Sequence, residues 1–240
     1  MSAVLFSSAD GVATLTLNRP ESRNALNSEM CAALTEFSGK ISRDENIKVV
    51  FVRANGPAFC AGADLKERQG MDAAQVRERR MKAFEAYAAL EALPMPAIAV
   101  VEGPCVGSGC EIAAACDFIV ATPAASFRTP EALRGTVGAT QRLARALGKR
   151  LAKDMMFAGR ALSAEEAREA GLVSRLVSSQ DLNSVLEEIK ATLSKAPAQS
   201  LRLAKRCIDR GVETDPEGAL ALEIAAIDEQ LASGSWMGKT

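Results

Sequence analysis

Two short, continuously apolar runs, each followed by a turn that contains glycine, constrain the fold most strongly. Val49–Arg53 and Ala97–Val101 are rich in β-branched side chains, so they predict buried strands. Strands that are apolar on both faces must be covered by helices, and a long helical pattern lies between these two runs. The sequence therefore predicts an α/β fold in which short strands alternate with covering helices.

The other expected elements follow from turn residues and hydrophobic spacing. Asp10-Gly11 predicts a hairpin, and Pro94 and Pro96 end a long helix. The expected ranges are hairpin strands over Val4–Ser7 and Val12–Leu17, a helix capped by Asn27 or Ser28 and running towards Arg43, a helix over Ala73–Ala92, an apolar helix beginning near Gly109, and a strand over Phe118–Ala121.

The last third of the chain has a different pattern. Apolar residues recur there at helical spacing, from Leu182 to Leu193 and from Leu201 to Ile208, and a final helix is expected from about Glu217 to Leu231. No strand-like run follows Leu176-Val177. We therefore expect two parts, a core over residues 1–195 and a C-terminal helical module over residues 196–240.

The chain contains no histidine among its 240 residues. This excludes Ser-His-Asp and Cys-His triads and metal centres with histidine ligands, and it leaves acid–base chemistry to carboxylates, thiols, lysine or tyrosine. The charge is balanced, with 29 Lys+Arg against 30 Asp+Glu. A nucleic-acid-binding surface is normally clearly basic, so this balance argues against a nucleic-acid partner.

Cysteine usage and hydropathy predict a cytoplasmic protein without a metal. The six cysteines form no C-x-x-C pair, and most of them lie in apolar runs, which is typical of reduced, buried thiols. The N-terminal segment MSAVLFSSADG has no basic start leading into an apolar stretch, so no signal peptide is expected. No segment approaches the ~18 unbroken apolar residues of a membrane span.

Two turns could present backbone N–H groups to a ligand, namely Phe59–Lys66 and Gly103–Glu111. Ordinary tight turns between a strand and a helix are the alternative. The second turn is not a dinucleotide fingerprint, because Ile112 occupies the place of the third glycine. It is not a nucleophile elbow either, because glycines do not flank Ser108 at the required offsets.

Two carboxylates accompany these turns. Glu111 opens the apolar run CEIAAACDFIVA, where an unpaired carboxylate is costly to bury, and Glu131 follows Pro130. The alternative for both is a structural carboxylate in the first turn of a helix. Taken together, the turns and the carboxylates form a coherent set of two amides for an oxyanion and two acids for proton transfer.

Four stretches resemble the crotonase (enoyl-CoA hydratase/isomerase) superfamily. They read LNRPESRNALNSEM, AFCAGADLKE, GSGCEIAAACDFIVA, and FRTPEALRG followed by TQRLARALGKRLAKDMMFAGRALSAEEAREAGLVSRLV. The resemblance covers nearly the whole chain in order. It implies a spiral of ββα units with a helical C-terminal trimerisation module, assembled as a homotrimer or as a hexamer of two trimers.

The resemblance also implies a substrate and residue roles. The substrate is an acyl-CoA thioester, no separate cofactor or metal is needed, and the amides of Ala63 and Ser108 hold the thioester oxygen. Glu111 falls on the carboxylate that acts mainly on water, and Glu131 on the one that acts on the Cα proton. The positions that match the family's CoA contacts are Arg23, Ala25, Ala61, Asp64, Leu65 and Lys66.

The expected function is therefore an enoyl-CoA hydratase of fatty acid metabolism (β-oxidation). Isomerase or other thioester-enolate chemistry is the first alternative, and a non-catalytic acyl-CoA-binding protein is the second. Residues around Met71–Met81 and the helix from Met155 are candidates for the acyl pocket. The cluster of basic residues Arg77, Arg79, Arg80 and Lys82 is interpreted as a solvated helix face balanced by Glu78 and Glu85.

The chain departs from the family pattern at three places. Ser108 stands where glycine is usual, and the loop ALRGTVGA after Glu131 is shorter than usual. The sequence ends at Trp236–Thr240, without the basic, aromatic tail that often reaches a neighbour's CoA. The shorter loop bears on the rate of hydration and on the orientation of Glu131. The missing tail bears on the contacts that one subunit makes with the CoA of another.

Overall fold

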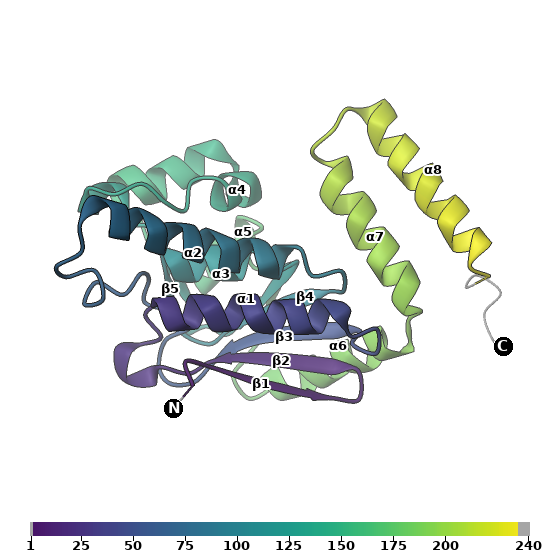
Figure 1. The fold of residues 1–240 in the computed structure, drawn as a ribbon, viewed down its shortest axis with the longest axis horizontal. Helices are drawn as coiled ribbons and strands as arrows, with labels where there is room; N and C mark the ends of the chain where they lie inside the picture. Colours follow the sequence, from purple (N-terminus) through teal and green to yellow (C-terminus); the bar gives the residue numbers. More distant parts are fainter. Residues whose placement is uncertain (1, 235–240) are drawn as a thin grey trace.

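The computed structural model describes residues 2–234, and its centre is a six-stranded sheet (Figure 1). The strand order is β1-β2-β3-β4-β6-β9, and all neighbours are parallel except the antiparallel pair β1 and β2. The strands are β1 (Val4–Ala9), β2 (Val12–Leu17), β3 (Val49–Ala54), β4 (Ala97–Val101), β6 (Phe118–Ala121) and β9 (Arg175–Leu176).

The N-terminal hairpin is confirmed. Asp10 and Gly11 both have positive φ, +52° and +77°, which is the backbone of a type I′ turn. Val12 of β2 lies opposite Val49 of β3 in parallel register. The hairpin therefore forms one edge of the sheet.

Helices cover both faces of the sheet, as the two apolar runs predict. Phe51, Ile98 and Val120 pack on α6 (Leu182–Lys195). The alternate residues of the same strands, such as Val52 and Ala99, belong to the larger core cluster on the opposite face. There the sheet is covered by α1 (Ser28–Arg43), α2 (Ala73–Glu91) and α3 (Ser108–Ala114) (Figure 1). Asn27 is the N-cap of α1, because its side chain accepts a hydrogen bond from the N–H of Met30 at 2.9 Å.

A second, three-stranded sheet contains elements that the sequence did not predict. Its strands are β5 (Pro104–Val106), β7 (Ser126–Arg128) and β8 (Leu162–Ser163), in that order. Strands of two or three residues carry too few positions to show alternation. The order of β4, β5, α3, β6 and β7 gives the spiral of strand pairs and helices that the resemblance implied, within a mixed α/β fold.

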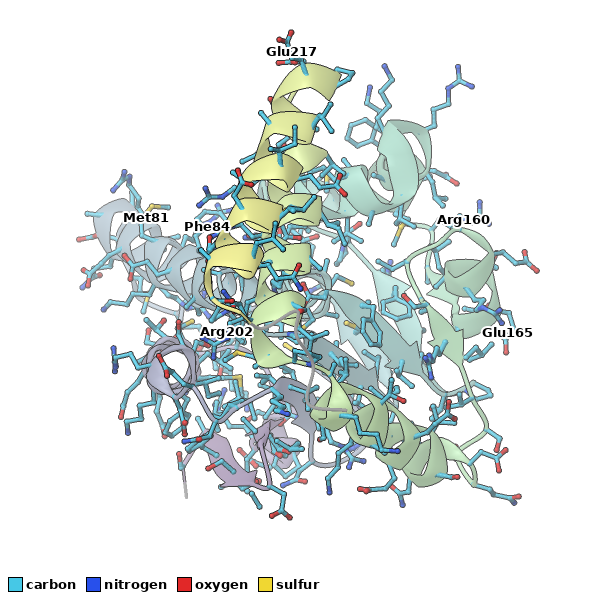
Figure 2. All side chains as sticks on the ribbon, turned by 90° about the vertical axis from the view of Figure 1, so that its right-hand side faces the viewer. Met81, Phe84, Arg160, Glu165, Arg202 and Glu217 are labelled. Atoms are coloured by element: carbon cyan, nitrogen blue, oxygen red, sulfur yellow. The ribbon has the colours of Figure 1, made fainter. Side chains whose placement is uncertain are left out.

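The remaining helices lie beyond these sheets. They are η1 (Pro20–Ser22), η2 (Ala132–Arg134), α4 (Arg142–Lys153), η3 (Asp154–Ala158), α5 (Ala164–Glu169), α7 (Ala198–Gly211) and α8 (Pro216–Ala232). Helices α7 and α8 pack on each other and stand to one side of the core (Figure 1), and Glu217 marks the outer end of α8 (Figure 2). Helix α6 ends at Lys195, so the expected division between 1–195 and 196–240 falls between helices and stays a prediction. The end at Trp236–Thr240 lies outside the described residues.

The structure bears on the state of the cysteines and on the expected lack of a membrane-spanning helix. Five of the six cysteines are buried and all six are free thiols, as expected. Over residues 2–234, no helix has both the length and the apolar character needed to cross a membrane.

Candidate active site

The first glycine-containing turn leaves one backbone N–H without an acceptor. Leu26 pairs with this turn in parallel fashion: its N–H donates to the Gly62 carbonyl at 2.8 Å, and its carbonyl accepts from the N–H of Asp64 at 2.9 Å. The residue between them, Ala63, therefore points its N–H the other way, and among residues 2–234 no acceptor lies within hydrogen-bond reach of it. Gly62 makes this path possible with a φ of +100°.

The second turn presents a matching N–H at the start of α3. Gly107, with a φ of +51°, is the N-cap, and Ser108 is the first helical residue. The first N–H groups of a helix have no partner inside the helix, and within the described chain the Ser108 N–H has none elsewhere. The two turns are joined by hydrogen bonding: the Val106 N–H donates to the Cys60 carbonyl at 2.9 Å, and Cys60 pairs with Cys105.

One cavity of about 80 Å³, hereafter the inner cavity, is lined by both of these residues and by both predicted carboxylates, Ala63, Ser108, Glu111 and Glu131. Its other walls come from α2, from the loop after Glu131 and from Arg68, which lies between the first turn and α2. These lining residues are Arg68, Arg79, Arg80, Ala83, Phe84, Tyr87, Thr136, Gly138 and Ala139. The structure therefore brings together the four residues predicted for chemistry, although they lie on three separate segments, with Ser108 and Glu111 both on α3.

Glu111 is an ion-paired, buried carboxylate. Its residue is 5% exposed, and its Oε2 accepts a hydrogen bond from Nη1 of Arg142 at 2.9 Å. The partner charge offsets the cost of burying a carboxylate in the apolar first turns of α3. A charged carboxylate held in this way can accept a proton from water.

Glu131 lies in a different environment. Its Oε2 is buried and has no hydrogen-bond partner among the described residues, and its Oε1 lies against Gly107, where an added Cβ would come within 2.2 Å. Burial raises the pKa of Glu131, and the negative charge of Glu111 acts in the same direction. A carboxyl group whose pKa is raised holds its proton more readily and can donate that proton to a substrate atom as a general acid.

The raised pKa of Glu131 predicts a pH-dependent stabilisation by Glu131→Gln. A carboxyl whose pKa is raised by folding contributes full stability below its unfolded pKa and loses it as pH rises through the folded pKa. We expect the Gln variant to unfold at a higher temperature than wild type at pH 7 and at the same temperature near pH 4. In a chain of this size each 1 kcal/mol would raise Tm by ~2–4 °C. Thermal unfolding from pH 4 to 8 measures this, with the exposed Glu188→Gln on α6 as the control. Equal Tm differences at both pH values would contradict it.

The positions that match CoA contacts lie along one rim, with one exception. The carbonyl of Arg23 accepts from the N–H of Ala61 at 3.0 Å, so the segment with Arg23 and Ala25 runs beside the first turn. Ala61 and Leu65 line a larger adjoining cavity of about 690 Å³, hereafter the outer cavity. Arg23 and Lys66 are exposed.

Asp64 is the exception, because its carboxylate faces the protein. It pairs with Arg19 at 2.9 Å and accepts hydrogen bonds from the N–H groups of Lys66 and Glu67. Although burial acts to raise it, these partners hold the pKa of the Asp64 carboxyl below its usual value. The side chain of Asp64 therefore organises the turn that carries Ala63.

The interpretation of Arg79 and Arg80 as part of a solvated face is wrong. Glu78 and Lys82 do form an exposed pair at 2.8 Å. Arg79, however, is buried and donates to Glu67 and to the Leu26 carbonyl, and Arg80 lines the inner cavity. Arg79 stands four residues before Ala83 on the apolar face of α2, a helical spacing that could have revealed its burial.

The two segments predicted to line the acyl pocket lie in different places. Met71 lines the outer cavity, together with Val76. Met155 instead belongs to the buried core cluster. Tyr87 of α2, which was not among the site residues predicted from the sequence, lines the inner cavity beside Ser108. Burial raises the pKa of Tyr87 far above its usual value, although a hydrogen bond with Ser108 opposes this, so the hydroxyl stays protonated.

The short loop after Glu131 folds back on itself. The Thr136 N–H donates to the Glu131 carbonyl at 3.0 Å, and the Thr136 hydroxyl accepts from Arg80 at 3.1 Å. Ala139 completes the loop in the left-handed region, with a φ of +53°. The loop thus closes the inner cavity and holds Glu131 in contact with Gly107.

The fold and this geometry define a class of protein. Two unpaired amides converge with an ion-paired carboxylate and a carboxyl of raised pKa, at the ends of strands in a spiral α/β fold. This is the arrangement of an acid–base site built around a stabilised oxyanion.

Comparison with known proteins agrees with this class. A family model described as enoyl-CoA hydratase/isomerase matches residues 7–235. YngF of Bacillus subtilis (strain 168) is 40% identical over 224 residues, which are 92% of this chain and 86% of YngF. The short-chain-enoyl-CoA hydratase of Clostridium acetobutylicum is 37% identical over 223 residues, 91% of this chain and 85% of that protein. A crystal structure of an enoyl-CoA hydratase from Bacillus anthracis matches with a TM-score of 0.90 and 34% identity, covering 94% of this chain and 90% of that one. The chain belongs to the enoyl-CoA hydratase/isomerase family.

Proposed function

We propose that this protein is an enoyl-CoA hydratase that adds water reversibly across the 2,3 double bond of a trans-2-enoyl-CoA to give the 3-hydroxyacyl-CoA. One observation carries the proposal: Glu111 and Glu131 share the inner cavity with the amides of Ala63 and Ser108. Glu111 is ion-paired, and the pKa of Glu131 is raised by burial. Hydration needs a base that accepts a proton from water and an acid that donates a proton to Cα.

The chemistry follows from where charge develops. The two amides bind the thioester oxygen as it gains negative charge, and each such donor can contribute roughly 2.7–4 kcal/mol. Electron withdrawal makes Cβ electrophilic, and Glu111 accepts a proton from the water that attacks it. Glu131 then gives its proton to Cα, which completes the addition. No step requires a metal or a redox cofactor.

The two cavities suggest how the substrate lies. The outer cavity, with Ala61 and Leu65 in its wall, would take the CoA side of the thioester, and exposed Arg23 and Lys66 would meet the CoA phosphates. Asp64, through its side chain, and Ala25, through its carbonyl, would hold this rim in place, because Arg19 binds both. The rings of Phe84 and Tyr87 close the small inner cavity, so short 2-enoyl groups should react fastest.

A product assay tests the proposal. Purified protein is incubated with short, medium and branched 2-enoyl-CoAs and with 3-enoyl-CoAs, and the products are identified by chromatography. We expect 3-hydroxyacyl-CoA from short 2-enoyl-CoAs at a rate that EDTA does not change, since no three His, Cys, Asp or Glu side chains in residues 2–234 converge as a metal site. Binding of CoA esters without consumption of any 2-enoyl-CoA would contradict the proposal.

The short loop beside Glu131 favours one second candidate, an enoyl-CoA isomerase or another thioester-enolate reaction. Such a reaction needs a proton carrier such as Glu131 but does not require a group that activates water. Interconversion of 3-enoyl- and 2-enoyl-CoA without 3-hydroxyacyl-CoA would identify it. Binding without any turnover would instead indicate a non-catalytic acyl-CoA-binding protein.

The proposal extends to assembly and location. Exposed apolar side chains on α7 and α8, among them Ile208, Leu220, Ile224 and Ile227, support a homotrimer or a dimer of trimers. The free cysteines, five of them buried, and the balanced charge support a cytoplasmic enzyme whose partner is an acyl-CoA, with no nucleic acid or membrane partner.

A further inference from the structure

Arg142, the first residue of α4, connects the catalytic carboxylate to a different helix. Its Nη1 donates to Oε2 of Glu111 at 2.9 Å, and its Nη2 donates to Oε2 of Glu91 at 2.6 Å. Glu91 is the last residue of α2, and Glu111 lies in the first turn of α3. One guanidinium therefore joins α2, α3 and α4 at the back of the inner cavity.

The Arg142 guanidinium is held on several sides. The side chain is only 18% exposed, its Nε is buried, and its Cζ lies 5.8 Å from the centroid of the Tyr87 ring. A planar, fork-shaped group fixed at two nitrogens and against a ring has little freedom to rotate. Glu111 thus receives its hydrogen bond from a fixed direction.

This hydrogen bond uses only one of the two carboxylate oxygens of Glu111. Oε2 is paired with Arg142, and no side chain among the described residues donates to Oε1. The side chain of the second acid, Glu91, is 55% exposed and that of Glu111 only 6%, so water screens the charge of Glu91 more than that of Glu111.

We propose that Arg142 is the positioning residue for Glu111: it binds Oε2 and leaves Oε1 directed at the water. This inference rests on the proposed hydratase function and adds a residue to it. Arg142 does not line the inner cavity itself. Its effect should therefore reach the reaction only through Glu111.

The test compares Arg142→Met and Arg142→Lys with Arg145→Met as the matched control. Arg145 lies one turn further along α4 and forms an exposed ion pair with Glu213, so its loss removes a guanidinium from the same helix without removing a hydrogen bond to Glu111. Misplacing a catalytic group by about 1 Å can cost ~10²-fold in rate. We expect Arg142→Met to lower kcat ~10²-fold with little change in KM, Arg142→Lys to recover part of the loss, and Arg145→Met to match wild type. Thermal unfolding checks that each variant is folded.

A double-mutant cycle with Glu111→Gln separates positioning from a merely structural role. If Arg142 acts through Glu111, adding Arg142→Met to Glu111→Gln lowers kcat no further, because the group it orients is already absent. A further loss of the full ~10²-fold in the double variant would overturn the proposal, as would a rise in KM with kcat unchanged.

A spectroscopic measurement keeps the inference testable even if the wild type hydrates no enoyl-CoA. The carboxyl ¹³C signal of Glu111, assigned through Glu111→Gln, reports its charge and hydrogen bonding. We expect this signal to shift in Arg142→Met and not in Arg145→Met. An unchanged signal in Arg142→Met would overturn the proposal independently of the function of the enzyme.

Discussion

Glu131→Gln is expected to lower kcat for hydration by ~10²–10⁴-fold and to change KM little. General acid–base groups contribute rate enhancements of that order, and a carboxyl that only transfers a proton supplies no ground-state affinity. The glutamine side chain keeps the shape of Glu131 but cannot deliver a proton to Cα. Steady-state kinetics with a short 2-enoyl-CoA measures both constants. The raised pKa of Glu131 is the physical basis for assigning the acid role to this residue.

Glu111→Gln provides the matched comparison. We expect a similar loss in hydration, but a different result for exchange of the α-proton of a saturated acyl-CoA in deuterated water. Exchange should be lost in Glu131→Gln and retained in part in Glu111→Gln, because the Ala63 and Ser108 amides still stabilise the enolate there. Equal exchange rates in wild type and Glu131→Gln would refute the assignment of Glu131 as the acid that acts on Cα. They would favour the candidate functions other than hydratase.

Gly107→Ala is expected to abolish most of the activity, with a loss of at least ~10²-fold in kcat. A Cβ at Gly107 would come within 2.2 Å of Oε1 of Glu131, so the Glu131 carboxyl must move away from this position. The displacement moves the proton donor away from Cα and disturbs the N-cap from which the Ser108 N–H is presented. Loss of α-proton exchange together with hydration would show that Glu131 has moved.

Gly135→Ala is the control for the backbone. Gly135 also has positive φ, +69°, but nothing lies within 4 Å of the position of an added Cβ. Alanine at Gly135 carries the left-handed penalty of ~1–2 kcal/mol. Gly107, with φ 51° and ψ −108°, also has a backbone that disfavours alanine, but only there does the added Cβ contact Glu131. A comparable fall in kcat for both variants would mean that backbone strain, and not the contact with Glu131, causes the effect.

Much of the fold could be read from local patterns. The hairpin at Asp10-Gly11, the two buried strands and the helix that ends before Pro94 depend on residues close in sequence, and the structure has them where they were expected. Glu111 stood out for a related reason, since a carboxylate at the start of an apolar run is unusual whatever the fold, and Glu131 stood out by its place after Pro130. Strands β5, β7 and β8 were missed because each is too short to carry a pattern.

The site itself depends on contacts between distant segments. Pairing of Cys60 with Cys105 and of Leu26 with Ala63 brings the two unpaired amides to one cavity, and no local pattern encodes such pairings. The sequence by itself determined the class of fold and the candidate acids, because periodicity and the cost of buried charge act over a few residues. Only the tertiary structure decided which acid is ion-paired and which is not. It places Arg142 beside Glu111 and leaves Glu131 buried without a partner, and the charge of a carboxylate depends on such neighbours in space.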